Sequence, residues 1–323
     1  MRIFSDANYP FIEKRKTAYF FSGILLLVAI GSMVANLALT GSWQNYGVDF
    51  TGGSLIQVRF DIPMTAGELR DALGGANAPE ITQFGSESDF NIRAPVMENA
   101  SVDEVRQQIQ ADLTSAFGEG GFEVLEAELV SPKVGGELQR KAAFAIIFSF
   151  FLTLIYLAIR FELRFGVAAI IATVHDILLT LGFLALFRVE IALPTVAALL
   201  TIVGYSLNDT IVVFDRVREN LGRKGGRKED PAALVNRSIN ETLPRTVLTS
   251  GTTLAVLLSL LILGGPVIRD FTMVLILGVL IGTYSSIFVA SPALLEIQKR
   301  WGTGDSREKD KARRRRKSAS VPV

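Results

Sequence analysis

Two carboxylates interrupt apolar stretches of the chain. Asp209 lies in the string IVGYSLNDTIVVFDRVREN, inside an apolar run from Ile191 to about Phe214, and Asp176 lies in a second run. A carboxylate in such surroundings is costly, which makes it a candidate functional site. The chemistry available to it is uptake and release of a proton. The alternative is that Asp209 is kept neutral or salt-bridged for helix packing.

Arg245 is the candidate partner of Asp209, because it follows Pro244 at the start of another apolar run. Proline suits the first turn of a helix, so we expect a helix to begin there. Burial favours a protonated carboxyl group, whereas a nearby guanidinium favours the carboxylate. Moving Arg245 toward or away from Asp209 would therefore switch the acid between proton release and uptake. One proton crossing about 100 mV yields about 2.3 kcal/mol, enough to bias a two-state element.

Asp176 follows His175 directly. Neighbouring side chains point to different faces of a helix, so we do not expect a ready-made dyad. A packing or hydrogen-bonding role and a role in proton transfer remain equal alternatives. Ser206, Asn208 and Thr210 surround Asp209 in the sequence. Their side chains either hydrate a proton path or form hydrogen bonds between helices.

The composition and the missing motifs exclude several other chemistries. The 323 residues include one His and no Cys, which excludes thiol nucleophiles, Cys-ligated metals and His clusters. No G-x-x-x-x-G-K-[ST] or G-x-G-x-x-G cradle is present, so no nucleotide is expected as a direct energy source. G-x-S-x-G and H-E-x-x-H are absent as well. We predict no enzyme, no metal and no cofactor, with protons as the only coupling ion.

Six apolar runs must position these residues. Mean hydropathy is +0.37 with 49% hydrophobic residues, and a hydrocarbon core about 30 Å thick needs about 20 apolar residues in a helix. We therefore predict a polytopic α-helical membrane protein with six transmembrane helices. The predicted spans are residues 17–40, 142–160, 165–187, 191–214, 246–268 and 271–295.

Charge divides the chain unevenly. Residues 41–139 hold 16 of the 32 acids and 5 of the 33 basic residues, a formal charge of −11 against +12 for the remainder. Basic residues flank the spans in the other segments, which the positive-inside rule places in the cytoplasm. We predict cytoplasmic termini and one exported domain. The segments are a cytoplasmic N-terminus at 1–16, the exported domain at 41–139, a cytoplasmic loop at 215–245 and a basic cytoplasmic tail at 296–323.

The exported segment reads as a small α+β domain. Alternating apolar residues predict strands at Ser54–Phe60, Ile81–Phe84, Asp89–Ala94 and Phe122–Val130, with helices at Ala66–Leu73 and from Ser101, where Glu104 completes a capping box. This order is the ferredoxin-like β-α-β-β-α-β arrangement. The 16 acids either shape a binding surface or only solvate an exported domain.

The tail contains KARRRRK, Lys311–Lys317. Three roles are open for this segment. It fixes the topology of the chain, it binds anionic membrane lipid with about 1 kcal/mol of attraction per basic residue, or it binds RNA. The first two roles are favoured over RNA binding.

Two strings carry a resemblance to a known family. GVDFTGGSLIQVRF, Gly47–Phe60, and GYSLNDTIVVFDRVREN, Gly204–Asn220, resemble the signatures of the bacterial SecD/SecF family, of the SecF type. The similarity continues through NRSINETLPRTVLTSGTT, Asn236–Thr253.

The resemblance implies a subunit of the Sec preprotein translocase in the bacterial inner membrane, within the resistance-nodulation-division superfamily. It implies SecD, the SecYEG channel and the translocating preprotein as partners, with the proton-motive force driving late steps of export. Asp209 and Arg245 would be the proton-relay residues, although family usage often has Ser where Pro244 stands. The matching glycines would permit a tight turn and the aspartate would cap or pair structurally; these positions are Gly47, Asp49, Gly52 and Gly53.

Two other functions remain open. In the first, the chain would be a passive scaffold that stabilises the SecD assembly. In the second, it would be a small-molecule exporter of the same superfamily. Six spans and one exported domain of about a hundred residues are small for such an exporter.

Overall fold

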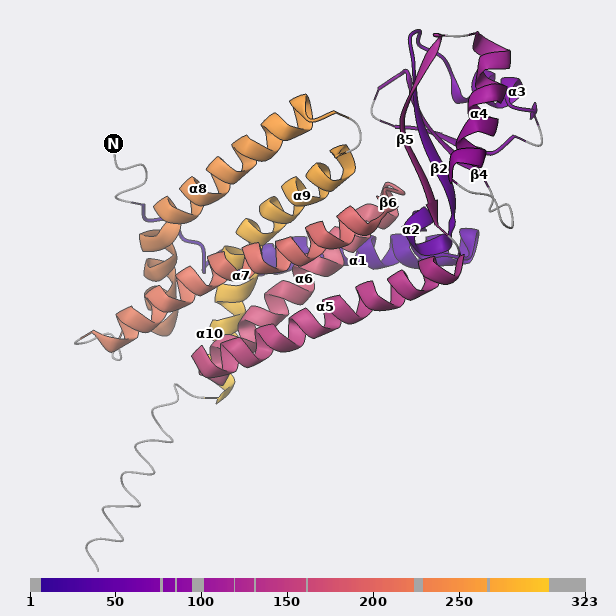
Figure 1. Cartoon of the computed structure of the whole chain (residues 1–323). Coiled ribbons are helices and arrows are strands. Elements are labelled where there is room, and N and C mark those ends of the chain that lie inside the picture. The colour runs from indigo at the N-terminus through magenta and orange to yellow at the C-terminus, as the bar shows by residue number, and fades with distance from the viewer. Residues whose placement is uncertain are drawn as a thin grey trace, which may run out of the picture.

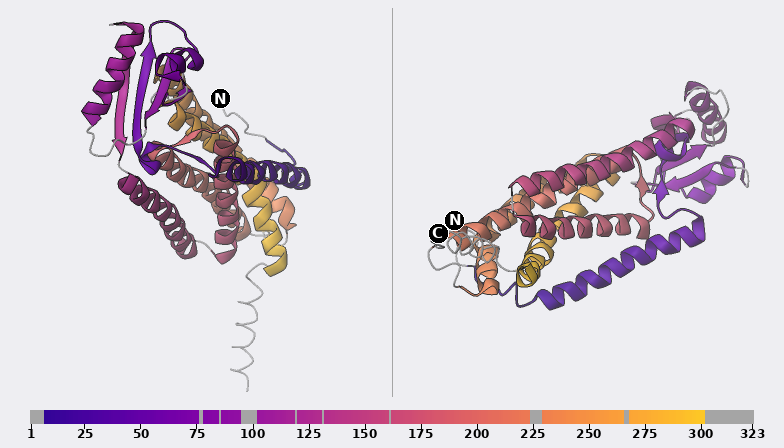
Figure 2. Two further views of the ribbon diagram at one scale, coloured as in Figure 1. Left: turned by 90° about the vertical axis from the view of Figure 1, so that its right-hand side faces the viewer. Right: turned by 90° about the horizontal axis from the view of Figure 1, so that it is seen from below.

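The computed structural model describes residues 7–75, 78–84, 86–94, 102–118, 120–130, 132–160, 162–223, 229–265 and 268–301. These residues form two parts (Figure 1). A bundle of long helices makes up most of the molecule. A small domain with a β-sheet, here called the sheet domain (53–130), stands at one end of the bundle in all the views of Figures 1 and 2.

Within the part of the chain that the structure describes, the bundle contains six helices long and apolar enough to cross a membrane, as predicted. The last of them is α9, which continues through one π-helical turn, η3, into α10. The bounds are α1 Arg15–Thr40, α5 Pro132–Arg160, α6 Leu163–Leu186, α7 Leu193–Gly222, α8 Pro231–Leu263, α9 Arg269–Ser285, η3 Ser286–Ala290 and α10 Ser291–Trp301.

Several helices extend beyond the predicted spans. Helix α5 begins at Pro132, inside the segment assigned to the exported domain, and α7 and α8 take up much of the predicted loop 215–245. The prediction that Pro244 starts a helix is wrong, since α8 begins at Pro231 behind the capping side chain of Asp230. Polar helical turns outside the hydrocarbon core leave no apolar signal, so hydropathy could not reveal them.

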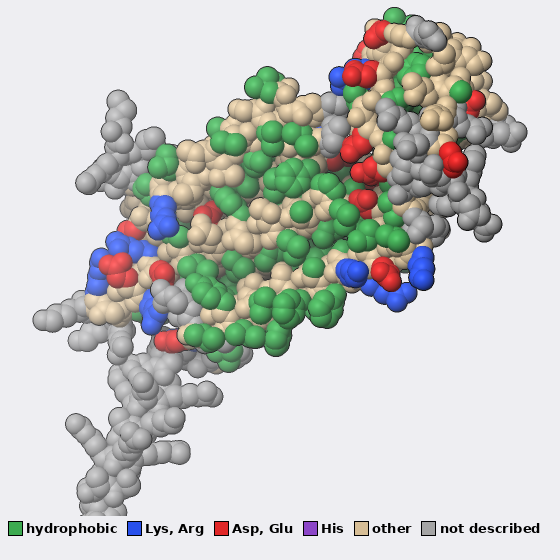
Figure 3. Space-filling view, in the orientation of Figure 1, with side chains coloured by type: hydrophobic (Ala, Val, Ile, Leu, Met, Phe, Trp, Pro, Cys, Tyr) green, Lys and Arg blue, Asp and Glu red, His purple; other side chains and the backbone are tan. Residues whose placement is uncertain are grey.

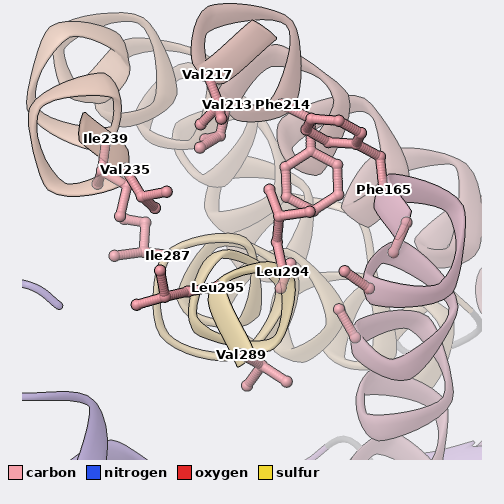
Figure 4. Packing of buried hydrophobic residues seen from close by; sticks show 14 of the residues in the cluster. Phe165, Val213, Phe214, Val217, Val235, Ile239, Ile287, Val289, Leu294 and Leu295 are labelled. Atoms are coloured by element: carbon pink, nitrogen blue, oxygen red, sulfur yellow. The ribbon is translucent and has the colours of Figure 1, made fainter. Parts of the chain in front are cut away.

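Helices α6, α7 and α9 form the centre of the bundle, whereas α1, α5 and α8 bury few of their apolar side chains. Figure 3 shows such side chains spread over the outer face of the bundle. Gly278 and Gly282 of α9 allow it to pack closely on α7, because a Cβ at Gly278 would lie 2.1 Å from Ile202 Cγ1. At the end far from the sheet domain, Phe165 packs edge-on against Phe214, next to Leu294 (Figure 4).

The sheet domain has four antiparallel strands in the order β3-β4-β2-β5. Along the chain its elements follow the predicted β-α-β-β-α-β order. Their bounds are β2 Gly53–Phe60, α3 Ala66–Ala72, β3 Glu80–Gln83, β4 Asp89–Ala94, α4 Val102–Phe117 and β5 Phe122–Val130. The predicted cap at Ser101 and the basic tail Lys311–Lys317 lie outside the described residues.

One face of this sheet is apolar and the other is polar. Ile56, Val58 and Ile92 are buried on the apolar face together with Leu69 of α3 and Leu113 of α4. On the polar face Asp89 is 1% exposed and accepts hydrogen bonds from Arg59 Nε at 2.7 Å and Nη2 at 3.3 Å. The strand alternation read from the sequence therefore corresponds to these two faces.

The Arg59–Asp89 pair makes stability of the sheet domain depend on pH. Burial raises the pKa of Asp89, but hydrogen bonds from Arg59 and Ser86 outweigh it and hold the pKa below its usual value of 3.8. A lowered folded-state pKa gives stability that is present above the unfolded value and is lost as the pH falls through the folded value. We expect the protection of the β2 and β4 amides of the full chain, taken relative to an unstructured peptide at the same pH, to fall below about pH 4. Asp89→Asn should exchange faster at neutral pH and lose that acid step; an unchanged step would contradict this assignment.

Candidate functional site

Asp209 lies at the centre of the bundle, 2% exposed, on α7. Ser250 of α8 places its Oγ 3.5 Å from Asp209 Oδ2, a long hydrogen bond. Ser250 Oγ also lies 2.7 Å from Thr283 Oγ1 of α9 and accepts a hydrogen bond from the Tyr205 hydroxyl at 3.1 Å. Three helices thus supply a row of hydroxyl groups that ends at the carboxylate.

These hydroxyl groups have two consistent orientations. Each carries one proton, and Thr283 Oγ1 also lies 2.7 Å from the carbonyl oxygen of Val279. When Ser250 donates to an ionised Asp209, Thr283 donates to Ser250. When Asp209 is protonated and donates to Ser250, Ser250 donates to Thr283 and Thr283 to Val279. Gain or loss of one proton at Asp209 therefore reverses the hydrogen bonds between Asp209, Ser250 and Thr283, while Tyr205 donates to Ser250 in both states.

Arg245 lies on α8, one turn and a half before Ser250, and its residue is exposed. Its guanidinium acts electrostatically on Asp209. The two groups form no ion pair within 4 Å, although both residues are among those described. Arg245 thus lies near enough to act on Asp209, but the two side chains do not form an ion pair in this conformation.

Asp176 of α6 forms a second cluster and is 1% exposed. Its Oδ2 accepts hydrogen bonds from Ser206 of α7 at 2.5 Å and from Ser285 of α9 at 2.7 Å. Its Oδ1 lies 2.9 Å from His175 Nδ1. The expectation that His175 and Asp176 do not pair is wrong, because the two short side chains reach each other across adjacent positions. An ionised Asp176 accepts all three bonds, which places the imidazole proton on Nδ1.

The two clusters lie one helical turn apart. Ser206 and Asp209 are both buried and three positions apart on α7, while Thr283 and Ser285 are two positions apart on α9. Asn208 is exposed, and Thr210 is buried without a hydrogen bond to either carboxylate. Of the three polar neighbours predicted from the sequence, only Ser206 contacts an acid.

Sequence reasoning missed Ser250, Thr283, Ser285 and Tyr205. Each is a small or aromatic polar residue in an apolar helix, a type common in membrane helices, so no single position stands out. Two sequence features could have indicated these residues. One span contains the polar string TSGTT, which includes Ser250, and another has Thr283 and Ser285 directly after the G-x-x-x-G motif.

The glycine-rich segment lies at the end of the bundle next to the sheet domain. Asp49, in the short helix α2 (Val48–Thr51), accepts a hydrogen bond from Leu193 N at 2.7 Å and so caps the start of α7. Gly47 packs where a Cβ would lie 2.4 Å from Glu190 Oε1. Gly52 and Gly53 have φ values of 75° and 125°, in the region that favours glycine.

Among the described residues no group of three or more His, Cys, Asp or Glu side chains is arranged to hold a metal ion.

Comparison with known proteins identifies the family of this chain. The family described as "Protein export membrane protein SecD/SecF, C-terminal" matches residues 109–300, and the "SecD/SecF GG Motif" matches residues 45–61. Protein translocase subunit SecF of Gemmatimonas aurantiaca is 46% identical over 93% of this chain and 90% of its own length. This chain belongs to the SecF family. SecF of Rhodothermus marinus is 42% identical over 93% of this chain and 96% of its own length.

A solved structure shares this SecF-family fold. SecDF of Thermus thermophilus, described as a translocon-associated membrane protein, superposes with a TM-score of 0.80 at 40% identity. The match covers 93% of this chain but 40% of that one, so the present chain spans less than half of the solved protein. The motif with Gly52 and Gly53 gives the second family match its name.

Proposed function

We propose that this SecF-family chain is a subunit of the bacterial Sec preprotein translocase that couples the proton-motive force to late steps of export. The observation that carries the proposal is Asp209, a buried acid joined to a row of hydroxyl groups from α8 and α9 that reverses with its protonation. In this role Asp209 binds and releases the proton, and Arg245 sets which of the two is favoured.

SecD is the proposed partner at this site. The residue Arg245 is exposed on the bundle, and α8 carries it at the edge of the stretch of about 20 residues that crosses the hydrocarbon core. An exposed guanidinium beside the hydrocarbon core is stabilised by a counter-charge on a neighbouring chain. The unmatched part of the longer SecDF structure is the natural source of one. We further propose cytoplasmic termini in the inner membrane, an exported sheet domain, and contacts with SecYEG and the preprotein.

The test is preprotein release from vesicles that contain SecYEG and SecD with or without this chain. We expect an imposed proton gradient to accelerate release only when the chain is present, and an uncoupler to abolish the acceleration. Equal stimulation in both preparations would overturn the proposal. Co-purification with SecD and SecYEG, without gradient-driven efflux of small molecules, separates this function from that of an exporter.

A further inference from the structure

The start of α7 is fixed to the segment that leads into the sheet domain. Strand β1 (Asn45–Tyr46) pairs in parallel with β6 (Glu190–Ile191), and Gly47 N donates to Ile191 O at 2.9 Å. Asp49 then caps Leu193, the first residue of α7. The segment 45–49 and the beginning of α7 therefore form one unit.

Helix α2 is part of that unit. Phe50 is 6% exposed and belongs to a buried apolar cluster that also contains Leu184 of α6 and Ile202 of α7. The backbone of α2 lies against α5, where a Cβ at Gly135 would be 2.9 Å from the carbonyl oxygen of Phe50. Burial of the aromatic ring in this cluster stabilises the position of α2 by a few kcal/mol. The bundle thus holds the chain firmly up to residue 51.

The sheet domain begins immediately afterwards at a pair of glycines. Gly52 has φ 75° and ψ 165°, a conformation that other residues rarely adopt, and Gly53 follows with φ 125°. Such positions absorb changes of backbone angle at low cost. Gly52 and Gly53 are therefore suited to be a hinge between a fixed α2 and strand β2.

An ion pair closes the junction beside this hinge. Arg93 Nη2 of β4 lies 2.9 Å from Glu190 Oε2 of β6, with side chains 22% and 17% exposed. Partial burial makes the attraction stronger than that of a pair in open solvent. The contact links the sheet domain to the residue three positions before α7.

Other carboxylates of the sheet domain and of the bundle lie close together at this junction and repel one another. Glu128 of β5 shares the polar sheet face with Arg93, since both lie opposite Leu55 of β2. Burial raises the pKa of Glu128, and so do the nearby charges of Asp49, Glu126 and Glu190. If Arg93 leaves Glu190, the acids of the two parts repel one another, which favours separation of the sheet domain from the start of α7.

We propose that Arg93 and Glu190 form a latch, hinged at Gly52–Gly53, which opens and closes to pass movement of α7 to the sheet domain. Helix α7 is 30 residues long and carries Asp209 about 24 Å from its capped end, so it connects the two sites directly. The inference rests on the proposed function only in making Asp209 the source of the movement.

Distance measurement between spin labels tests the latch without a proton gradient. The chain contains no Cys, so Leu39→Cys on α1 and exposed Ser115→Cys on α4 would label the bundle and the sheet domain at single sites. We expect one narrow distance distribution in the parent and a broader or displaced one with Arg93→Glu. Adding Glu190→Arg should restore the parent distribution. Arg70→Glu on exposed α3 is the matched control and should change nothing.

An unchanged distribution in Arg93→Glu, or failure of the exchanged pair to restore it, would overturn the latch. Opening in the cycle is tested with Arg93→Cys and Glu190→Cys joined by a short reducible bis-thiosulfonate. We expect the linked chain to lose gradient-driven preprotein release and to regain it on reduction; full release while linked would overturn the proposal. A negative result with Asp209→Asn would leave the spin-label result standing, so the two failures are distinguishable.

Discussion

Asp209→Asn is expected to remove the gradient-dependent part of preprotein release and to leave the gradient-independent part intact. The amide keeps the size of the side chain but does not ionise, so gain or loss of a proton no longer reverses the hydrogen bonds through Ser250 and Thr283. Release with a gradient should fall to the level measured with an uncoupler. The measurement is release from vesicles containing SecD and SecYEG.

Asp215→Asn is the matched control, because it makes the same change six positions later on the same helix. Assembly with SecD should be normal in both variants. If Asp209→Asn released preprotein as fast as the control under a gradient, while removal of the chain stopped export, the chain would act as a passive scaffold.

The bundle and the sheet domain could largely be predicted from the sequence, because the spacing of apolar residues over short stretches indicates both the helices and the strands. Strands β4 and β5 have the predicted bounds, since alternation of apolar residues depends only on neighbours. Asp209 stood out for a related reason: it is a charge in an apolar run. Its setting among Tyr205, Ser250 and Thr283 depends on how three helices rotate against one another, which no local pattern fixes.

Predictions from local sequence patterns failed for the start of a long helix and for contacts between residues far apart in the sequence. Pro244 lies inside α8 because Pro231 and Asp230 already supply the start of that helix. The Arg93–Glu190 pair joins residues almost a hundred positions apart, so nothing in either neighbourhood signals it. Such contacts are set by the placement of the sheet domain, which follows only after the fold is complete.

Asp176→Leu is expected to cause a large loss of stability of the bundle. The carboxylate accepts from Ser206 of α7 and Ser285 of α9 and pairs with His175. Its removal leaves the buried Ser206 hydroxyl and the His175 ring without this partner, and leaves Ser285 with only the carbonyl oxygen of Gly282. Interhelical hydrogen bonds in membranes are worth about 0.6–2 kcal/mol each, which predicts a loss of a few kcal/mol. Thermal unfolding in detergent measures it.

Thr173→Val on the same helix is the control, because Thr173 is equally buried but donates only to Ala169 of its own helix. A melting temperature of Asp176→Leu no lower than that of the control would contradict the structural role. Asp176→Asn separates that role from proton transfer, since the amide still accepts through one oxygen but does not ionise. If the folded Asp176→Asn variant keeps gradient-driven release, Asp176 only holds α6, α7 and α9 together. If that release is lost, the proton passes Asp176 one helical turn before it reaches Asp209.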